Sequence, residues 1–405
     1  MSEILRVDMG VIRSFEEIFP AGTPADTPVV TLFSGGLDST YLLYRLKSLR
    51  AKNVHALTVE LGEDESRQTK QEICDQLGIQ LHVVDARERF VEDFVWPAIA
   101  AQAVYLDTHP ISSSLSRPLI AEVAQELAES LGAPIMLHTA NRSQNTLRRL
   151  NGAFALLGYK GRYGSPYDLD PIDREQKIVE LKAAGLHQMS ERHVSGDSNL
   201  WCREFESGFL DDPEDHRVPE HMYQWSEVAN AIAKESVQVS FVAGRPTAVN
   251  GVEMPLMDLI SVLNRQCGAY GIGRYSGLEH LEGDVKVLEL REMPAAWILL
   301  KSFRHLETAV LSSETIREKM HTEQVWVREA LEGRWFGELR AAAQAFVGSC
   351  AAKVTGSVRW RLSVGQAQTD SITADQPLYV RNREAWETES IWLERSSFRA
   401  AASVN

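Results

Sequence analysis

The chain has 405 residues, of which 44% are hydrophobic and 24% are charged, so it is long enough for two or three domains with a sizeable core. Its formal net charge of −14 disfavours a general nucleic-acid-binding surface, because neutralising phosphates requires clustered lysine and arginine. A membrane helix needs about 18 or more consecutive apolar residues, and the sequence has no such run. Small-molecule chemistry is therefore the better expectation, without nucleic acid or membrane as a partner.

The cysteines are widely spaced and include no C-x-x-C pair, which argues against a zinc ribbon and against a disulfide framework. They are Cys74, Cys202, Cys267 and Cys350, and we expect reduced thiols. The first six residues contain an acid and lack the apolar region of a secretory signal. These features together predict a cytoplasmic protein.

Residues 1–27 contain Gly22 and Pro24 and are expected to form an N-terminal leader packed on the surface. From Val29 onward, apolar strand patterns alternate with helical ones. The predicted strands are Val29–Phe33, Val54–Val59 and Ile79–Val84, with a polar helix at Ser66–Gln76. This alternation predicts right-handed βαβ crossovers and a parallel sheet, with ligands bound at the carboxyl ends of the strands.

After the third strand, Asp85 is expected to cap a helix that Pro97 kinks or interrupts. Further helices are predicted at Arg174–Ala184, Leu256–Arg265, Trp297–Lys319 and Glu323–Cys350, and further strands at Val237–Val242 and Val358–Val364. Several glycines between residues 268 and 277 lack the strand-then-helix context of a dinucleotide fingerprint. We therefore expect a loop-rich turn there.

The strand at Val29–Phe33 runs directly into the sequence S-G-G-L-D-S-T, after which Leu42, Leu46 and Leu49 recur on one face of a predicted helix. Such a strand-to-helix turn points backbone N–H groups outward, and its glycines let an anion approach the backbone. Hydroxyl groups and the positive end of the helix dipole add to this preference. The stretch therefore predicts phosphate or pyrophosphate binding.

Asp38 is the exception in this loop, because a carboxylate repels phosphate unless a divalent cation lies between them. We therefore expect Asp38 to hold Mg²⁺. The loop is not G-x-x-x-x-G-K-[ST] and has no lysine for a terminal phosphate. It resembles the pyrophosphate loop of the ATP pyrophosphatase superfamily, whose members cleave ATP between the α and β phosphates. The alternative is an ordinary βα turn capped by serine and aspartate.

Later segments resemble the argininosuccinate synthase family in colinear order, from about Val29 to about residue 365. That family has D-x-R-E-E-F-V-x-x-F-x-x-P-A-I, T-S-L-x-R-P-x-I-A, S-x-D-x-N-L-W-G and E-x-G-x-L-E-D-P. The matching segments here are Asp85–Ile99, Ser112–Ile120, Asp197–Trp201 and Glu206–Pro213. Several independent blocks agree, so the chain is identified as a member of this family.

The resemblance implies an α/β fold with a parallel-sheet nucleotide-binding domain of the ATP pyrophosphatase type at residues 28–165. It also implies an α+β synthetase domain at 166–374 and a C-terminal oligomerisation tail at 375–405, in an assembly that is usually a tetramer. The implied reaction activates the ureido oxygen of citrulline as an adenylate, with loss of pyrophosphate, before the amine of aspartate displaces AMP. ATP, Mg²⁺ and small amino-acid-like substrates are the implied ligands.

The resemblance also implies site residues. ATP would be bound by Ser34, Gly35, Gly36, Leu37, Asp38, Ser39, Thr40 and Ala56, and Asp38 and Arg149 would be catalytic. The substrate-binding positions would be His109, Ser114, Asn141, Asn145, Thr146, Arg149, Ser195, Glu204, Glu279 and Arg291. Four of these match positions that the family uses around citrulline, namely Ser114, Arg149, Ser195 and Glu279. In contrast, His109, Glu204 and Arg291 replace a tyrosine, a serine and a tyrosine of the family.

The loop after Ile135–Leu137 departs further, because the family has H-G-x-T-G-K-G-N-D-Q-x-R-F-E there. Three glycines are absent, and the threonine and aspartate expected to hold the amino donor are Asn141 and Thr146. A neutral threonine cannot replace a carboxylate that pairs with an ammonium group. Nearby cations form a basic patch that indicates either an anionic substrate group or a solvated helix face; they are Arg142, Arg148, Arg149, Lys160 and Arg162.

We therefore expect an ATP-dependent ligase that adenylates a ureido or carboxyl/amide oxygen and couples it to an amine, with non-standard substrates. One alternative is a genuine argininosuccinate synthase that serves arginine biosynthesis, because a pocket can rebuild the same recognition with other residues. Another is a non-catalytic nucleotide-binding module. A sulfur-inserting RNA enzyme shares the loop but would need a reactive cysteine pair and a basic RNA face, and neither is evident.

Overall fold

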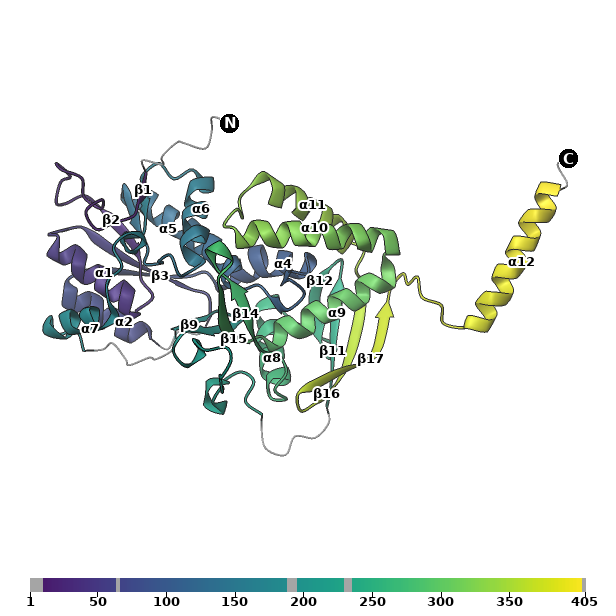
Figure 1. The fold of residues 1–405 in the computed structure, drawn as a ribbon. Helices are drawn as coiled ribbons and strands as arrows, with labels where there is room; N and C mark the ends of the chain where they lie inside the picture. The colour runs from purple at the N-terminus through teal and green to yellow at the C-terminus, as the bar shows by residue number, and fades with distance from the viewer. Residues whose placement is uncertain (1–9, 63–65, 188–194, 229–234, 403–405) are drawn as a thin grey trace.

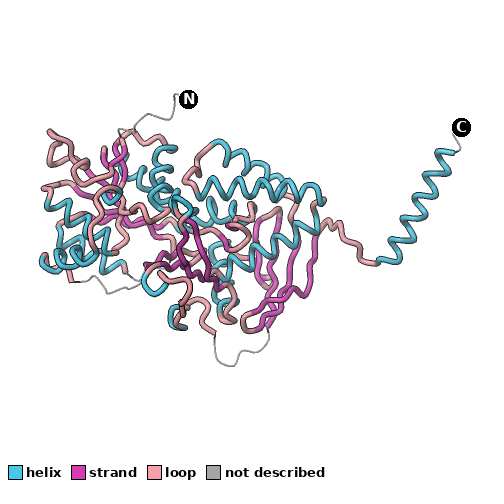
Figure 2. The backbone as a smooth tube through the Cα atoms, in the orientation of Figure 1, coloured by secondary structure: helices cyan, strands magenta, loops and turns pink. Residues whose placement is uncertain are grey.

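The structure is a computed structural model that describes residues 10–62, 66–187, 195–228 and 235–402. Its strands form separate sheets along an elongated body, and a C-terminal helix stands away from that body (Figures 1 and 2). The parallel sheet occupies the N-terminal end, and antiparallel sheets with long helices occupy the remainder. This arrangement confirms the expected α/β architecture.

Six strands form the parallel sheet, in the order β1-β8-β7-β2-β3-β4, and every neighbouring pair is parallel. They are β1 (Val11–Ile12), β8 (Arg162–Gly164), β7 (Ile135–Leu137), β2 (Val29–Leu32), β3 (Val54–Glu60) and β4 (Gln80–Asp85). Apolar side chains point to both faces because helices cover both. Val29 and Ala56 share a core with α1 (Leu37–Ser48) and α7 (Arg174–Ala183), whereas Val30 and Leu57 pack in the core that contains α5 (Ser113–Leu131).

The helices of this region are α1 (Leu37–Ser48), α2 (Arg67–Leu77), α5 (Ser113–Leu131), α6 (Thr146–Leu157) and α7 (Arg174–Ala183). Leu42 and Leu46 are fully buried on α1, as the apolar periodicity predicts. The same prediction is wrong for Leu49, which is 41% exposed. The helix ends at Ser48 and the chain turns at Arg50, whose φ is 62°, so Leu49 lies beyond the buried face.

The segment before residue 28 does more than pack on the surface. Its residues Val11 and Ile12 form β1, an edge strand that pairs with β8. Ile12 and Ile18 are fully buried, and Phe15 is 7% exposed. The expectation of a surface leader is therefore wrong for the described part of this segment, because its apolar residues complete one face of the parallel sheet.

The chain reverses direction across the sheet at β2. From β2 it crosses to β3 and then β4 on one side, and it later returns to form β7 and β8 on the other side. The loops that follow β2 and β7 therefore diverge at the carboxyl edge, which is where open α/β sheets bind ligands. The S-G-G-L-D-S-T stretch follows β2 at this point.

Short elements connect the parallel sheet to the rest of the chain. They are α3 (Arg87–Phe90), a π-helical turn (Val91–Val95), α4 (Trp96–Ala100), β5 (Val104–Tyr105) and β6 (His109–Pro110), with 3₁₀ turns at Pro166–Asp168, Gly208–Leu210, Glu220–Met222 and Glu282–Asp284. The π-helical turn lies directly before Pro97. The expected interruption thus takes the form of a widened turn, which accommodates the proline without ending the helical path.

The C-terminal part contains two antiparallel sheets. One has the order β14 (Arg274–His280), β15 (Lys286–Glu292), β10 (Arg203–Glu206), β9 (Ser195–Ser198). The other has the order β13 (Val252–Glu253), β12 (Arg245–Val249), β11 (Glu235–Val242), β16 (Gly356–Ser363), β17 (Gln366–Ala374). Residues 269–273 link α8 (Leu256–Gly268) to β14, so the loop-rich turn expected at residues 268–277 is present but shorter than predicted, because Gly268 ends the helix and Gly277 lies within the strand.

Three long helices follow β15 where the sequence predicted two. They are α9 (Pro294–Val310), α10 (Ser313–Leu331) and α11 (Glu338–Ala351). The first boundary lies at Ser312, whose hydroxyl accepts a hydrogen bond from the backbone N–H of Thr315 at 3.3 Å. The second follows Gly333, whose φ is 74°. The predicted helix ends were wrong because these local caps interrupt a continuous apolar periodicity.

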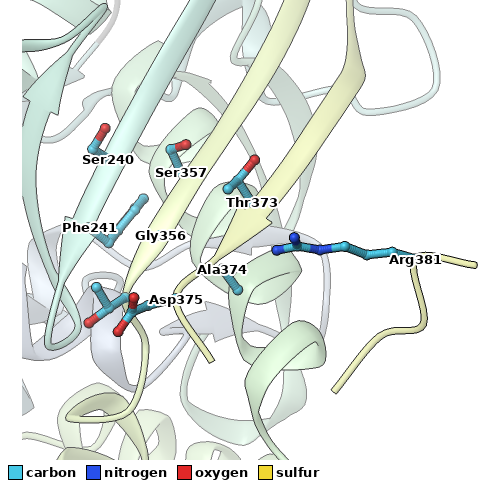
Figure 3. A pocket seen from close by; sticks show the side chains of 9 residues that line it. Ser240, Phe241, Gly356, Ser357, Thr373, Ala374, Asp375 and Arg381 are labelled. Carbon is cyan, nitrogen blue, oxygen red and sulfur yellow. The ribbon is translucent and has the colours of Figure 1, made fainter. Parts of the chain in front are cut away.

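The last helix, α12 (Arg383–Ala402), projects from the body (Figure 1). Its residues Trp386 and Ile391 are each 52% exposed. Close to the segment that leads into this helix, the second antiparallel sheet borders a cavity of about 470 Å³ (Figure 3). Asp375 and Arg381 line it together with Phe241, so this cavity belongs to the base of the arm. Within the described residues, no helix is both long and apolar enough to cross a membrane.

The role of β1 can be tested by replacing Ile12 with alanine. We expect Ile12→Ala to lower the free energy of unfolding by about 2–5 kcal/mol, because it removes a fully buried aliphatic side chain. Val179→Ala on α7 is the control, since Val179 is 66% exposed and its loss should cost less than about 0.5 kcal/mol. Chemical denaturation followed by fluorescence would measure both. Equal effects would mean that the N-terminal segment contributes nothing to this core.

Candidate functional site

The loop after β2 is a compact hydroxyl-rich turn at the N-terminus of α1. The hydroxyls of Ser34 and Ser39 lie 3.1 Å apart, and the hydroxyl of Ser39 donates to the carbonyl oxygen of Gly36 at 3.1 Å. The backbone N–H of Gly36 donates weakly to the Ser34 hydroxyl at 3.3 Å. Gly35 has a φ of 76°, which favours glycine. This geometry leaves a helix N-terminus and several small donors at the carboxyl edge of the sheet, as phosphate binding requires.

Two other residues predicted to contact ATP lie deeper. The Thr40 side chain is fully buried on α1, and its hydroxyl has no hydrogen-bond partner among the described residues. Ala56 is fully buried in the middle of β3, opposite Thr31 of β2. The structure therefore brings Ser34 to Ser39 together at the strand ends, whereas Ala56 contributes to the core beneath them.

Asp38 lies in the first turn of α1 and forms an ion pair that the sequence does not reveal. The ammonium of Lys177 on α7 lies 2.7 Å from the Asp38 carboxylate, and 4.7 Å from the centre of the Tyr167 ring. The Tyr167 hydroxyl donates to the backbone carbonyl of Asp38 at 2.9 Å. Burial, followed by the nearby Asp38 charge, raises the pKa of Tyr167, so this hydroxyl stays a donor.

A second lysine borders the same loop. A side chain added at Gly35 would lie 2.9 Å from the γ-carbon of Lys70, so the stem of this lysine covers the glycine closely. Lys70 is only 6% exposed. The loop therefore has two largely buried lysines around it, one from α2 and one from α7.

This arrangement does not favour Mg²⁺ bound by Asp38. Mg²⁺ demands near-octahedral oxygen coordination, and one Asp38 carboxylate oxygen is already engaged by Lys177. Within the described ranges, no group of three or more histidine, cysteine, aspartate or glutamate side chains could hold a metal ion, so a Mg²⁺ ion here would take most of its ligands from the phosphates of ATP. The residues present thus fit an ammonium against Asp38 better than the expected metal contact.

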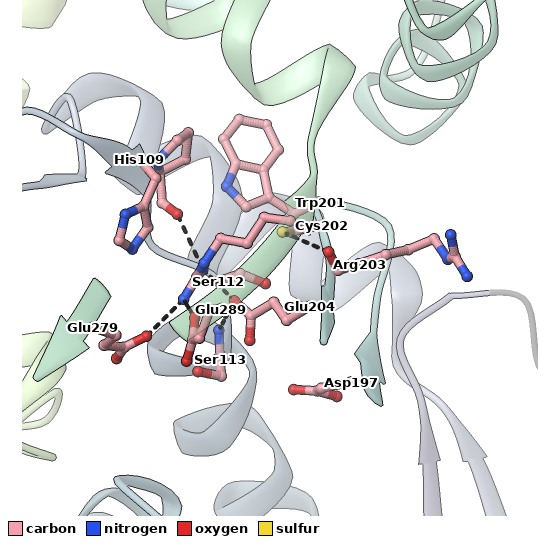
Figure 4. Close-up of polar contacts among 12 residues, drawn as sticks. His109, Ser112, Ser113, Asp197, Trp201, Cys202, Arg203, Glu204, Glu279 and Glu289 are labelled. Atoms are coloured by element: carbon pink, nitrogen blue, oxygen red, sulfur yellow. Dashed lines mark hydrogen bonds and ion pairs between the residues drawn. The ribbon is translucent and has the colours of Figure 1, made fainter. Parts of the chain in front are cut away.

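The second part of the site is a buried charge cluster centred on Arg291. Its guanidinium donates to Glu204, to Glu289 and, at 2.7 Å, to Glu279 (Figure 4). Glu204 lies on β10 directly opposite Arg291 on β15, while Glu279 lies on the neighbouring strand β14. The Arg291 side chain is 3% exposed, so these ion pairs are shielded from water.

Helix α6 of the parallel-sheet domain reaches into the same cluster. Arg149 donates to the Glu279 carboxylate at 3.1 Å and to the Ser113 hydroxyl at 2.7 Å. Asn145 donates through its amide nitrogen to Glu279 at 3.1 Å and to the His280 carbonyl at 2.9 Å. The site is therefore assembled from both domains.

The charges in this cluster do not balance if every group is ionised, since three carboxylates face two guanidinium groups. Burial raises the pKa of Glu289 and of Glu204 despite the attraction of Arg291. Burial also acts to raise the pKa of Glu279, but the charges of Arg149 and Arg291 outweigh it and lower that pKa. Of the three carboxylates, Glu279 is therefore the one whose charged form the surrounding guanidinium groups favour most.

Two buried polar atoms of the cluster lack a hydrogen-bond partner among the described residues. They are the side-chain oxygen of Asn145, an acceptor, and the Nε of Arg291, a donor. Buried polar groups are almost always satisfied in folded proteins. Their presence beside Glu279 fits a site that a substrate completes.

Of the remaining predicted substrate positions, His109 and Ser114 adjoin this cluster, whereas the side chains of Thr146 and Asn141 have partners outside it. His109 on β6 is 2% exposed and its ring centre lies 4.7 Å from that of Tyr275, while Ser114 is buried at the start of α5. The Thr146 hydroxyl accepts from Arg117 at 3.3 Å. The Asn141 side-chain oxygen accepts from the backbone and hydroxyl of Ser143 and so stabilises its own loop.

Ser195 is the first residue of β9 and pairs with Glu206 of β10, but its side chain lies outside what the structure describes. It therefore belongs to the same small sheet as Glu204.

The expected basic patch does not form one surface. Arg142 pairs with Asp168 at 2.7 Å, Arg148 with Glu332 at 3.3 Å, and Arg149 with Glu279 inside the cluster. Arg162 donates to the carbonyl oxygen of Ile18 at 3.3 Å, and Lys160 is exposed. The reading as a single solvated helix face is therefore wrong, because these side chains point in different directions and most have their own partners. The reading as a site for an anionic substrate group stays a prediction.

Sequence reasoning missed Glu289, Lys70 and Lys177. Glu289 had a detectable signal, since Glu289 and Arg291 alternate with Leu288 and Leu290 and so share one face of a strand. Lys177 had none, because it lies far along the chain from Asp38 on a helix with many charged residues.

A parallel α/β domain with a pyrophosphate-type loop, joined to a second domain that supplies a buried polar site, defines the class of ATP-dependent synthetases. Two family descriptions match this chain, the Arginosuccinate synthase N-terminal HUP domain at residues 28–159 and the Arginosuccinate synthase C-terminal domain at residues 194–398. The argininosuccinate synthase of Rubrobacter xylanophilus is 32% identical over 373 residues, covering 91% of each chain. That of Pyrococcus furiosus is 32% identical over 375 residues, covering 91% of this chain and 90% of the relative.

The chain therefore belongs to the argininosuccinate synthase family, and it is an ATP-dependent ligase of the kind that forms carbon–nitrogen bonds. Among solved structures, an NH₃-dependent NAD synthetase from Campylobacter jejuni overlaps with a TM-score of 0.27 and 17% identity, over 40% of this chain and 65% of that one. That overlap is too small to bear on the fold or on the reaction.

His109 allows a test of the burial of this site. Burial, and then the Arg291 charge, lowers the pKa of His109 to about 3, so the folded protein keeps it neutral. Between pH 7 and 5 the unfolded chain gains a proton there and the folded chain does not, so stability falls as pH falls. Over this range wild type should lose about 2 kcal/mol more than His109→Gln, by chemical denaturation at each pH.

The exposed His221 supplies the control, because His221→Gln makes the same substitution at a surface position outside the buried site. An equal loss of stability in wild type and His109→Gln would show that His109 is accessible to protons in the folded state.

Proposed function

We propose that this protein uses ATP to adenylate an oxygen of a small acceptor, releasing pyrophosphate. The carbon that bears this oxygen is then coupled to an amine, and AMP leaves. We further propose that the acceptor and amine are not both citrulline and aspartate. The observation that carries the second statement is the engagement of Arg291 with Glu204, Glu279 and Glu289 in one buried cluster.

The first half of the reaction is supported by the loop after β2. Its backbone donors, its hydroxyls and the N-terminus of α1 stabilise negative charge, and cleavage between the α and β phosphates places that charge on pyrophosphate. Mg²⁺ would accompany the phosphates of ATP, with Asp38 paired to Lys177. The protein's own contribution is to bind and orient the leaving group.

The residues at two positions of the acceptor site support a non-standard acceptor. In the family, the positions of Glu204 and Arg291 carry a serine and a tyrosine, which are neutral and available to a bound amino acid. Here they form an ion pair, and Arg291 also occupies Glu279, a residue matched to the family's citrulline contacts. Separating buried charges from their partners costs several kcal/mol, so a citrulline that needs Glu279 would compete against Arg291.

The unpartnered atoms indicate what the substrate offers instead. A hydrogen-bond donor would satisfy the Asn145 oxygen, and an acceptor would satisfy the Arg291 Nε. A substrate that carries an N–H next to a C=O, such as an amide or a ureido compound, offers one hydrogen-bond donor and one hydrogen-bond acceptor. The amide and ureido classes therefore remain the leading acceptors.

The residues of the loop after β7 support a non-standard amine. Thr146 takes the place of a family aspartate, and its hydroxyl already accepts a hydrogen bond from Arg117. The side-chain oxygen of Asn141 already accepts one from the Ser143 hydroxyl. No carboxylate of this loop is left to pair with the ammonium of aspartate. Replacing such a charge-assisted hydrogen bond with a neutral one forfeits roughly 1.5–3 kcal/mol.

The alternative function is argininosuccinate synthesis itself. It is favoured by relatives named argininosuccinate synthase, which align over about nine-tenths of this chain. It would require Arg291 to leave Glu279 when citrulline binds.

A homotetrameric cytoplasmic enzyme is the assembly that we propose. The exposed apolar side chains of α12 support this, because Trp386 and Ile391 on a helix that stands away from its own chain fit packing against other subunits. The four cysteines are free and buried, which suits a reducing compartment.

Product analysis tests the reaction class. Purified protein with ATP and an accepted substrate pair should form AMP and pyrophosphate in equal amounts, because the loop grips the leaving pyrophosphate. Chromatography of nucleotides with an enzymatic pyrophosphate assay would measure them. Stoichiometric ADP and phosphate would contradict the proposal.

A substrate panel tests the pocket. Citrulline, other ureido compounds and amides would each be combined with aspartate and a set of other amines, with pyrophosphate release and product mass as readouts. We expect citrulline with aspartate to be at least roughly tenfold less efficient in kcat/KM than the best pair, which is the low end of the lost charge-assisted contact. The double variant Glu204→Ser, Arg291→Tyr is the matched control for the acceptor pocket, since it restores the family's residues there, leaves the amine loop unchanged and should narrow part of that difference. Efficient argininosuccinate formation by wild type, above all other pairs, would establish the alternative function.

A further inference from the structure

The Asp38–Lys177 ion pair joins α1, which lies inside the matched N-terminal family domain, to α7, which lies outside both matched family domains. Asp38 lies within residues 28–159, which match the N-terminal domain, whereas Lys177 on α7 lies between that match and the C-terminal one at 194–398. The contact is 2.7 Å, and the side chains of Lys177 and Asp38 are 10% and 37% exposed. The pair is thus partly shielded and lies at the mouth of the pyrophosphate-type loop.

Lys177 is oriented from several sides. Its ammonium contacts Asp38 and faces the ring of Tyr167, and the Tyr167 hydroxyl is in turn fixed on the backbone of Asp38. Helix α7 is attached to α1 by a second contact, in which the Tyr41 hydroxyl donates to Glu180 at 2.7 Å. An ammonium has three donor hydrogens, so the observed contacts leave capacity for a phosphate oxygen.

The electrostatics of the loop require a cation at this point. A carboxylate in the first turn of α1 weakens the preference of the helix N-terminus for an anion. The Lys177 ammonium cancels that charge where a Mg²⁺ ion was expected. Lys70, whose stem covers Gly35, adds a second largely buried lysine on the other side of the loop.

We propose that Lys177 binds the pyrophosphate moiety of ATP and the released pyrophosphate, and that Asp38 acts as a positioning residue that holds Lys177 toward the loop. This inference rests on the proposed function, in which the loop grips pyrophosphate. It reassigns Asp38 from a metal ligand to a partner of the anion-binding lysine. It also extends the nucleotide site to α7.

The test is pyrophosphate binding by the full-length protein, measured by calorimetry with Mg²⁺ and again with EDTA. Lys177→Met should weaken binding roughly ten- to a hundredfold in both conditions, because it removes one charge-assisted contact. Lys177→Arg should retain most of the affinity, whereas Lys182→Met, an exposed lysine on the same helix, should match wild type. Lys177→Gln replaces the methionine variant if thermal melting shows that the latter does not fold.

A double variant separates the two roles of Asp38. If Asp38 acts only through Lys177, adding Asp38→Asn to Lys177→Met should cause no further loss of pyrophosphate affinity. The inference is overturned if Lys177→Met binds pyrophosphate as wild type does. It is also overturned if Asp38→Asn alone abolishes Mg²⁺-dependent binding while Lys177→Met leaves it intact. If wild type itself fails to bind pyrophosphate, the proposed function fails together with the inference. If wild type binds and Lys177→Met binds equally well, only the inference fails.

Discussion

The burial of Arg291 is the constraint on which the substrate site depends. A guanidinium removed from water is stable only when carboxylates and hydrogen-bond acceptors surround it, and here Glu204, Glu279 and Glu289 supply them. Each of these glutamates then has a fixed orientation, and each is less available to a ligand. One cationic side chain therefore sets the charge and the orientation of the acids in the substrate site that we propose.

The same cluster connects the two domains. Arg149 and Asn145 belong to the helix and loop that follow β7 of the parallel sheet, yet both donate to Glu279 on β14. A nucleotide bound at the carboxyl edge of the parallel sheet would thus lie next to groups supplied by the antiparallel sheet. This proximity is what a two-step ligase needs, because the adenylated acceptor must meet the amine without leaving the site.

The nucleotide end of the site uses a different device. The charges that surround Arg291 are almost fully buried, whereas Asp38 remains 37% exposed and Lys177 covers one side of it. A partly exposed pair can exchange partners at a lower desolvation cost than a buried one. Binding and release of a highly charged product are easier under that condition.

Much of the first domain could be predicted from sequence, because its signals are local. The apolar strands, the loop glycines and the helix that follows them are encoded within about 20 consecutive residues, and the structure confirms them from Val29 to Asp85. Helix ends were less predictable. Ser312 and Gly333 interrupt an apolar pattern that continues on both sides, so the pattern alone predicted two helices where three exist.

The sequence by itself determined which residue types are present at the site, including the glycines of the loop and the unusual Glu204 and Arg291. Only the tertiary structure decided that Arg291 faces Glu204 and Glu279, that Lys177 covers Asp38, and that the apparent basic patch divides among separate acids. The physical reason is that ion pairs depend on distances of a few ångströms between residues far apart in the chain. Those distances follow from how sheets and helices pack, and no local pattern records them.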